Sequence, residues 1–319
     1  KRDSYAEEIH KRSWDALIVD EAHYLRHQDT NRYEFVDDIE YRYAFFATAT
    51  PVQNDVTDIY NVTKLIRPGL FGTKSEFERR YLPNGDSEGV QSADDLNRQL
   101  QSVMIRHKRG DTKIDFTDRN VRTSSFEPSR REQSLYNAVT DYVRTHYSKQ
   151  AGQHLVMLML QKEVVSSPWA VLSTVEKWLD DDGRDVTGRE RDKLLSIAKQ
   201  ARQIERTTKQ EKLLEIIRSV NRRMDTGRTI VFTQFRATQD AIVNALQTDA
   251  GGEDVPVHRV SGSLSSGEKD DQIHHFKERG GVLVTTDSIS EGRNIQFCNV
   301  IINYDLPWNP MSVEQRIGR

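Results

Sequence analysis

The sequence predicts an α/β protein in which a helical region separates two sets of strands. Short apolar runs bounded by polar residues alternate with helical stretches before residue 110 and again after residue 228. Such runs are typical of strands in parallel sheets, and helices between them indicate right-handed βαβ units. Between about residues 128 and 226 the sequence shows helical patterns and no strand pattern. We therefore expect part of one α/β domain, a helical span and most of a second α/β domain.

The first part of the chain contains two predicted strands and two predicted helices. The run Ala16–Val19 predicts a strand buried on both faces, and Ala44–Thr48 predicts a second buried strand. Apolar residues three or four positions apart predict helices over Asp55–Ile66 and Ala93–Ile105. The pair Pro68–Gly69 ends the first of these helices.

The middle of the chain is predicted to consist of packing helices. The helical stretches are Leu135–Tyr147, Leu155–Val165, Val171–Leu179, Leu194–Ile204 and Leu213–Val220. The acidic run Asp180–Gly183 interrupts them and predicts an exposed turn. Because an apolar stripe on a helix usually faces a core, we expect these helices to pack on one another.

After residue 228, strands and helices alternate more regularly. The predicted strands are Thr229–Phe232, Pro256–Val260, Val282–Val284 and Val300–Ile302, with helices over Asp240–Leu246 and Glu268–Phe276. We therefore expect a first α/β domain over residues 1–125, a helical span over 126–226 and a second α/β domain over 227–319.

Composition excludes several classes of protein. A hydrophobic content of 36% with 30% charged residues fits a globular protein. The net charge of −3 gives no overall basic field, so any nucleic-acid binding must depend on local Arg and Lys. The single cysteine, Cys298, excludes an internal disulfide framework and a cysteine-based zinc site. With no apolar run of membrane-spanning length, we expect a cytoplasmic protein without a membrane partner.

The tetrad Asp20-Glu21-Ala22-His23 follows the first predicted strand directly. Open α/β sheets bind their ligands at the carboxyl ends of parallel strands. One carboxylate at such a position can hold the Mg²⁺ of a nucleotide, and the next can orient or deprotonate an attacking water. The tetrad therefore indicates a candidate nucleotide-hydrolysing site.

Three further polar segments fit a motor driven by a nucleotide. Thr48–Pro51 ends the second strand, Asp287–Asn294 follows a strand of the second domain, and Glu314–Arg319 offers two guanidinium groups. An arginine brought from a second domain stabilises the charge that spreads over a phosphoryl group in the transition state. Hydrolysis would then depend on closure between the domains, which couples chemistry to motion.

These segments resemble motifs II, III, V and VI of superfamily-two helicases, and within them the Swi/Snf family of double-stranded DNA translocases. Three further segments are also similar to sequence motifs of that family: Asn303–Pro310, Leu65–Gly72 and Ile105–Arg109. Glu291–Phe297 and Leu160–Pro168 most resemble its prokaryotic RapA/HepA-like branch. The resemblance extends over nearly the whole sequence, in the family's order.

The resemblance implies two RecA-like lobes joined by a helical span, the first lobe incomplete, with ATP and Mg²⁺ between them. Asp20 and Glu21 would be the metal-binding and water-activating pair. Arg319 would be an arginine finger, with Arg316 as a second catalytic arginine that supports the interface. The implied nucleotide contacts are Asp20, Glu21, His23, Gly292, Gln315 and Arg319. The residues implied to couple the nucleotide to nucleic acid are Thr48, Thr50, Gln234, Ser288, Glu291 and Asn294.

The resemblance also implies a DNA-dependent ATP hydrolase that tracks double-stranded DNA along its backbone. Three alternatives remain at this point: a strand-separating helicase, an RNA-directed motor, and a nucleic-acid-binding scaffold with an inactive ATPase. A partner such as RNA polymerase or another DNA-bound protein fits the RapA-like wording, and a prokaryotic protein of this kind would associate with the nucleoid.

Two parts of the family pattern are absent from the sequence. The glycine-rich loop with its lysine, which cradles phosphates in this family, would precede Lys1, and the last motif would continue past Arg319. We therefore expect this polypeptide to be a fragment with little or no ATPase activity by itself. We also expect Trp308 to lie in a core rather than to serve as a stacking platform.

Overall fold

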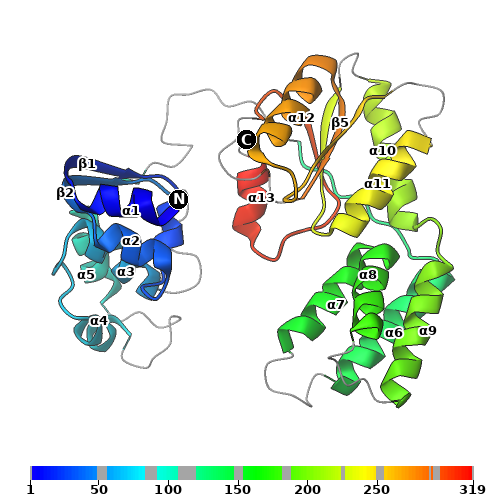
Figure 1. Cartoon of the computed structure of the whole chain (residues 1–319), viewed down its shortest axis with the longest axis horizontal. Coiled ribbons are helices and arrows are strands. Elements are labelled where there is room, and N and C mark those ends of the chain that lie inside the picture. Colours follow the sequence, from blue (N-terminus) through cyan, green and yellow to red (C-terminus); the bar gives the residue numbers. More distant parts are fainter. Residues whose placement is uncertain are drawn as a thin grey trace. The chain divides into compact units, whose positions relative to one another are not determined.

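The computed structural model describes ten stretches of the chain and divides it into two compact units (Figure 1). The described residues are 2–48, 56–82, 92–106, 120–146, 154–181, 188–223, 227–248, 255–286, 289 and 295–317. Unit 1 comprises residues 1–119 and unit 2 comprises residues 120–319. Among the described residues, no helix has both the length and the apolar character needed to cross a membrane.

Unit 1 is built on a pair of parallel strands with short helices around it. The strands are β1 (Ser13–Val19) and β2 (Glu40–Phe46), paired in parallel register. The helices are α1 (Arg2–His10), η1 (Ala22–Leu25), α2 (Asn31–Asp37), α3 (Thr57–Ile66), α4 (Lys74–Tyr81) and α5 (Ala93–Gln101). Both strands and the two predicted helices of this region are present, and α1, α2 and α4 lie outside every helix predicted from the sequence.

One face of the β1–β2 pair packs against helices. Side chains of η1, α2 and α3 form a core with the inward side of the strands; its members are Leu17, Val19, Leu25, Tyr33, Val36, Phe46 and Leu65. On the other face, Trp14, Ile18, Tyr43 and Phe45 are exposed, Ile18 to 75%. The expectations that Ala16–Val19 is buried on both faces and that Ala44–Thr48 is a buried strand are therefore wrong, since Phe45 is also 62% exposed. The described residues of unit 1 cover only one side of this pair.

A second core of unit 1 lies between α3, α4 and α5. It contains Tyr60, Phe77, Tyr81, Leu96 and Leu100, which are all buried. The aromatic rings meet in tilted contacts, with the Tyr60 and Phe77 centroids 5.1 Å apart. Tilted and edge-to-face contacts suit aromatic quadrupoles. The helices α3, α4 and α5 are therefore stabilised by a core of their own, in addition to the core beneath the strands.

The sheet of unit 2 has four parallel strands in the order β4-β5-β3-β6. The strands are β3 (Arg228–Phe232), β4 (Val257–Val260), β5 (Gly281–Thr285) and β6 (Val300–Asn303). The helices around them are α10 (Thr208–Asn221), α11 (Arg236–Thr248), α12 (Ser266–Arg279) and α13 (Pro310–Ile317). Every strand predicted after residue 228 is present.

Helices cover both faces of this sheet (Figure 1). On one face, α10 and α11 pack on Val231, Val282 and Val284; on the other, Phe276 of α12 packs on Leu283. In the central strands, Thr229–Phe232 of β3 and Val282–Thr285 of β5 are fully buried, as near-continuous apolar runs predict. Although α10 lies within the span predicted to be helical, it packs on the sheet of the second domain.

The remaining helices of unit 2 form a four-helix bundle. They are α6 (Arg130–His146), α7 (His154–Ser166), α8 (Pro168–Asp180) and α9 (Gly188–Arg202). Their apolar stripes meet in one core, with fully buried members such as Val139, Leu160, Val171 and Leu194. Proline at the first position of α8 suits a helix start, and the Ser167 hydroxyl caps this helix by accepting from the Ala170 amide.

Candidate active site

The Asp20-Glu21-Ala22-His23 tetrad forms a tight turn at the carboxyl end of β1. Asp20 Oδ1 accepts a hydrogen bond from the Glu21 amide at 2.8 Å. The Ala22 amide donates to Ala47 O at 2.9 Å, and the Ala47 amide donates to Val19 O at 2.8 Å. These bonds attach the turn to the end of β2. The two predicted catalytic carboxylates therefore follow one strand and are fixed to its neighbour.

Glu21 has a left-handed backbone conformation, with φ 52° and ψ 45°. Glu21 and Ser92 are the two non-glycine residues with positive φ in the described part of the chain. A residue that is not glycine pays about 1 kcal/mol or more for this conformation, and such residues cluster at functional sites. The strain indicates that the surrounding structure imposes the orientation of Glu21.

His23 links the two strand ends. Its side chain is 6% exposed, and its Nδ1 lies 3.2 Å from Thr48 Oγ1 and 3.2 Å from Glu21 Oε2. A proton on Nδ1 can be donated to either oxygen. The ring also contacts Tyr24, with the centroids 4.3 Å apart. The structure thus brings together three residues of the predicted site, from the first and second polar segments.

Gln234 connects strand ends in unit 2. It follows β3, where its backbone amide donates to Asp305 Oδ2 at 3.0 Å and its side-chain Nε2 donates to Leu306 O at 3.2 Å. Both acceptors follow β6. Gln234 therefore holds the polar segment after β6 against the carboxyl end of the sheet.

Arg316 on α13 is fully buried. Its Nη1 donates to Asn303 Oδ1 at 2.7 Å and to Asp305 O at 3.1 Å, and its guanidinium lies 4.7 Å from the Phe232 ring centroid. A guanidinium engaged in this way orders the end of the sheet. The predicted catalytic role of Arg316 remains a prediction. Gln315, on the same helix, is half-buried.

The other predicted site residues lie outside the described part of the chain. They are Thr50, Ser288, Glu291, Gly292, Asn294 and Arg319. Their predicted roles remain predictions.

Comparison with known families identifies the chain. Residues 3–228 match the SNF2-related domain, and residues 208–319 match the helicase conserved C-terminal domain. The chain belongs to the SNF2-related family. A Bacillus subtilis relative, "Uncharacterized ATP-dependent helicase YqhH", is 34% identical over 100% of this chain and 55% of its own length. The SNF2-related chain therefore spans about half of that relative.

Two more distant proteins complete the comparison. Mouse "Chromodomain-helicase-DNA-binding protein 6" is 22% identical over 98% of the SNF2-related chain and 11% of its own length. The helicase domain of Hef from Pyrococcus furiosus has a TM-score of 0.50 at 15% identity, covering 99% of this chain and 71% of that one. This structural likeness shows the fold alone. It confirms the predicted fold class, in which helices flank parallel sheets as in RecA-like lobes.

The carboxylate oxygens of the turn after β1 suit Mg²⁺ bound together with a nucleotide. Mg²⁺ prefers oxygen ligands and is usually held by one or two carboxylates together with substrate phosphates. Asp20 and Glu21 supply two carboxylates on consecutive residues. In the part of the chain that the structure describes, no group of three or more His, Cys, Asp or Glu side chains could hold a metal. The two carboxylates of the turn fit the usual protein share of such a site.

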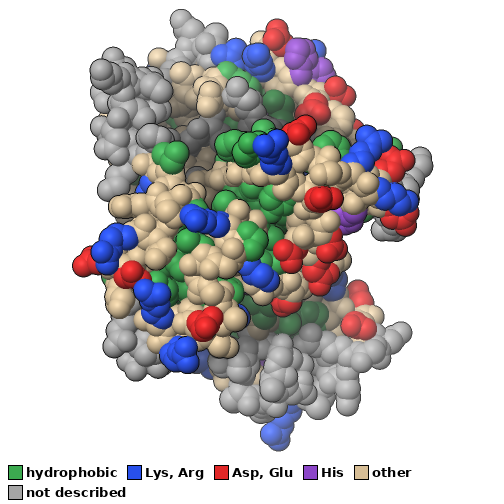
Figure 2. Space-filling view, turned by 90° about the vertical axis from the view of Figure 1, so that its left-hand side faces the viewer, with side chains coloured by type: hydrophobic (Ala, Val, Ile, Leu, Met, Phe, Trp, Pro, Cys, Tyr) green, Lys and Arg blue, Asp and Glu red, His purple; other side chains and the backbone are tan. Residues whose placement is uncertain are grey.

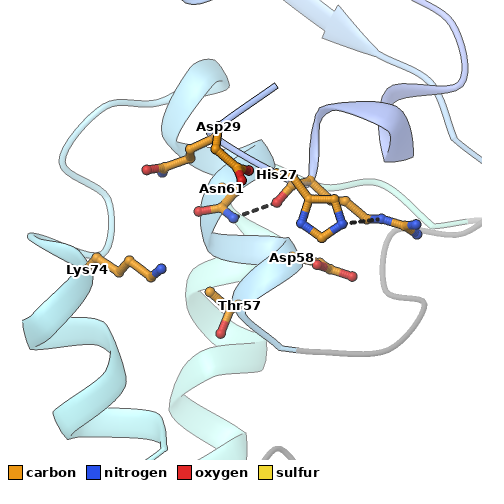
Figure 3. Close-up of a pocket in the computed structure, with 8 residues that line it drawn as sticks. His27, Asp29, Thr57, Asp58, Asn61 and Lys74 are labelled. Atoms are coloured by element: carbon orange, nitrogen blue, oxygen red, sulfur yellow. Dashed lines mark hydrogen bonds between the residues drawn. The ribbon is translucent and has the colours of Figure 1, made fainter. Parts of the chain in front are cut away.

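A pocket of about 380 Å³ lies between the segment after η1 and the starts of α3 and α4 (Figure 3). Its lining residues are Arg26, His27, Gln28, Asp29, Thr57, Asp58, Asn61 and Lys74. Asn61 Nδ2 donates to Arg26 O at 2.5 Å, which fixes one wall. Lys74 and the two aspartates place opposite charges around the same space. Its lining thus carries both signs of charge, and sequence reasoning did not find it.

Trp308 is 69% exposed. The expectation that it lies in a core is wrong, because the chain turns outward after Asp305 and also leaves Leu306 exposed. Lys162 Nζ of α7 lies 4.3 Å from the centroid of the indole ring. A cation over an exposed indole gives a modest attraction of about 0.5–1 kcal/mol.

Asp305 is a functional candidate that sequence reasoning missed. It follows β6 and is 7% exposed, and its carboxylate accepts four hydrogen bonds. Burial alone would raise the pKa of this carboxyl, but the Lys209 ammonium and the bonds from Lys209, Thr233 and Gln234 lower it. The available signal was weak: Asp305 lies two residues beyond the end of β6, whereas Asp20 follows β1 directly.

Proposed function

We propose that the protein is an ATP-dependent double-stranded DNA translocase of SNF2 type, which couples ATP hydrolysis between two lobes to movement along DNA. Membership of the SNF2-related family supports an ATP-dependent motor. The observation that carries the proposal is the turn after β1, where Asp20 and strained Glu21 are held by His23 and by the neighbouring strand end.

The residues of this turn have separate roles in the proposed reaction. Mg²⁺, when bound with ATP, neutralises charge on the phosphates. Asp20 would hold the metal, and Glu21 would orient the attacking water and accept its proton. His23 lies 3.2 Å from the Glu21 carboxylate and from Thr48, so it would fix the direction of the base and transmit changes to the second strand end. Arg319 would stabilise the transferred phosphoryl group, with Arg316 ordering the helix that precedes it.

Double-stranded DNA is the proposed partner. The name of the mouse relative states that it binds DNA. The low net charge means that binding would depend on local contacts with phosphates, and Figure 2 shows basic and acidic side chains interspersed on one face of the molecule. Such contacts carry no sequence information, so we expect little base preference and strong sensitivity to salt.

Glu21→Gln in the full-length protein tests the proposed hydrolysis. The amide keeps the size of the side chain but cannot accept the proton, so ATP binding should persist while DNA-stimulated turnover falls by a factor of about 10² or more. Glu8→Gln, which changes an exposed glutamate of α1, is the matched control and should retain turnover. Normal turnover by Glu21→Gln would refute the assigned base.

A triplex displacement assay separates translocation from strand separation. A translocase should remove a third strand from a DNA triplex in the presence of ATP and leave the underlying duplex paired. Unwinding of the duplex would instead identify a strand-separating helicase. A protein that binds DNA without hydrolysing ATP in any condition would identify a scaffold with an inactive ATPase.

A further inference from the structure

One buried carboxylate joins four parts of unit 2. The Asp305 side chain accepts from Ser166 Oγ at 2.8 Å, Lys209 Nζ at 2.8 Å, Thr233 Oγ1 at 2.6 Å and the Gln234 amide at 3.0 Å. These donors lie at the end of α7, at the start of α10 and directly after β3. A side chain of the segment that follows β6 thus contacts the four-helix bundle directly.

The junction between the bundle and the sheet is polar and closed to solvent. Ser166 and Ser167 both hydrogen-bond to Thr238 Oγ1 of α11, at 2.9 and 2.6 Å. All three side chains are buried. A satisfied network of buried polar groups fixes one arrangement, because any displacement leaves donors or acceptors unpaired at a cost of about 1–3 kcal/mol each.

The ammonium of Lys209 completes the junction. Its Nζ donates to Val165 O at 3.2 Å as well as to Asp305, and it lies 4.2 Å from the Tyr304 ring centroid. The pair is largely buried, with 16% of the lysine and 8% of the aspartate side chain exposed. Removing one member of a buried ion pair leaves the other charge buried without a partner, which lowers stability. Removing both members often leaves stability nearly unchanged.

The backbone of Asp305 faces a different element. Its carbonyl accepts from Nη1 of Arg316, the buried arginine of α13, which also donates to Asn303. The side chain of Asp305 therefore holds the bundle while its carbonyl holds α13. Ser166 and Arg316 meet at this residue although 150 positions separate them in the sequence.

We propose that Asp305 is a positioning residue for ATP hydrolysis: it ties α13, which leads into the predicted arginine finger, to the four-helix bundle, so that displacement of the bundle reorients α13. This inference rests on the proposed ATPase function. It adds a route by which contacts of the bundle with DNA or a partner would alter the arginine segment.

The first test measures the junction without any activity. In Asp305→Asn, the Lys209 ammonium loses its anion, and the unfolding equilibrium constant of the chain should rise about 100-fold or more. The double variant Asp305→Asn/Lys209→Met removes both charges and should recover most of this loss. The control Glu176→Gln, which removes an exposed pair with Arg202, should change the constant less than about fivefold. Equal effects of Asp305→Asn and the control would overturn the inference.

Hydrogen exchange on the folded double variant locates the effect, even where the single variant fails to fold. Amides of α13 and of the α7–α8 junction should exchange about 10-fold faster than in the wild type. Amides of β5, which Asp305 does not contact, should keep their protection. Wild-type protection in both α13 and the junction would show that other contacts fix these elements and would overturn the inference.

The second test separates positioning from stability in the full-length protein. The double variant should show kcat for DNA-stimulated ATP hydrolysis lowered by on the order of 10²-fold, with KM for ATP within about twofold. A double variant with wild-type kcat and recovered stability would show that Asp305 is structural only. An inactive wild-type protein would overturn the proposed function itself, whereas an active double variant overturns this inference alone.

Discussion

Glu163 shows how a single buried carboxyl can make stability depend on pH. It lies on α7 inside the bundle, where burial raises its pKa to about 7, although the hydrogen bond from Thr174 and the charge of Lys177 oppose the shift. Its Oε1 accepts from Thr174 Oγ1 at 2.7 Å, and its Oε2 has no hydrogen-bond partner among the residues that the structure describes. The folded bundle therefore favours the protonated, neutral form.

We expect Glu163 to destabilise the bundle as pH rises. Below the ordinary pKa near 4.5 the carboxyl is protonated in both the folded and the unfolded chain, so its ionisation does not change the free energy of unfolding. Between pH 4.5 and 7 the unfolded chain releases the proton first, and stability should fall by about 3 kcal/mol. Glu163→Gln should remove this fall and be more stable than the wild type above pH 7. Urea unfolding from pH 4.5 to 8 measures both curves.

The control for this prediction is Glu176→Gln on α8 of the same bundle. In its ion pair with Arg202, 41% of the glutamate side chain and 59% of the arginine side chain are exposed. Its substitution should leave the pH dependence between 4.5 and 7 unchanged. A wild-type profile that is flat across this window would contradict the raised pKa of Glu163.

Thr48 offers a second test at the scale of one side chain. Thr48→Val removes the hydroxyl that meets His23 Nδ1, while Glu21 Oε2 remains within reach of the same nitrogen. We expect a loss of stability below about 1 kcal/mol but a clear fall in DNA-stimulated kcat, since the side-chain link between His23 and the end of β2 is lost while the backbone bonds remain. Thr48→Ser, which keeps the hydroxyl, should retain most of the activity. If both variants keep wild-type kcat, the His23–Thr48 contact has no coupling role.

At the scale of elements, capping residues could have revealed the helices that apolar periodicity missed. In α4, the Thr73 hydroxyl accepts from the Glu76 amide and the Glu76 carboxylate accepts from the Thr73 amide, a capping box that is legible in the sequence. Thr30 likewise caps α2 by accepting from the Tyr33 amide. Both helices are short, so each contains too few periodically spaced apolar residues for the helix to be predicted from that spacing.

The strands of the two units illustrate what an apolar run can and cannot predict. In β3, Ile230–Phe232 is fully buried, as its pattern indicates. Ala16–Val19 has the same pattern, yet Ile18 is exposed. A run of apolar residues predicts that a strand forms, but the neighbours that cover it come from elsewhere in the sequence.

The exposed face of the β1–β2 pair leads to a stability prediction. Ile18→Thr keeps a β-branched side chain and changes an exposed position, so the free energy of unfolding should change by less than about 0.5 kcal/mol. Leu65→Ala opens a cavity in the core on the opposite face and should cost about 2–5 kcal/mol. Urea unfolding of the two variants provides the comparison. A larger loss for Ile18→Thr than for Leu65→Ala would contradict the one-sided core.

At the scale of the whole molecule, the candidate residues of unit 1 (Asp20 and Glu21) and of unit 2 (Asp305) differ in how far the sequence reveals them. Asp20 and Glu21 were predicted because consecutive carboxylates follow a strand, which is a local signal. Asp305 was missed because its partners are distant in sequence: Thr233 is 72 positions away and Ser166 is 139. Burial and contacts of this kind become visible only when the fold brings the segments together.

Unit 2 should behave as one cooperative body. The bundle and the sheet have separate apolar cores, but the polar junction at Asp305 joins them. We therefore expect a polypeptide of residues 120–319 to fold and to unfold in a single calorimetric transition, with calorimetric and van't Hoff enthalpies in agreement. Two resolved transitions would show that the junction contributes too little to couple the bundle to the sheet.

The outward position of Trp308 gives the chain an intrinsic optical reporter. An indole in water emits at longer wavelength and is readily quenched by acrylamide. Trp14 is less exposed than Trp308, at 38%, and Trp169 and Trp178 are partly shielded within the bundle. A molecule that binds to the loop after β6 would shift the emission of Trp308 and shield its indole ring from the quencher. A fluorimeter can therefore follow occupancy of this surface in real time without a label.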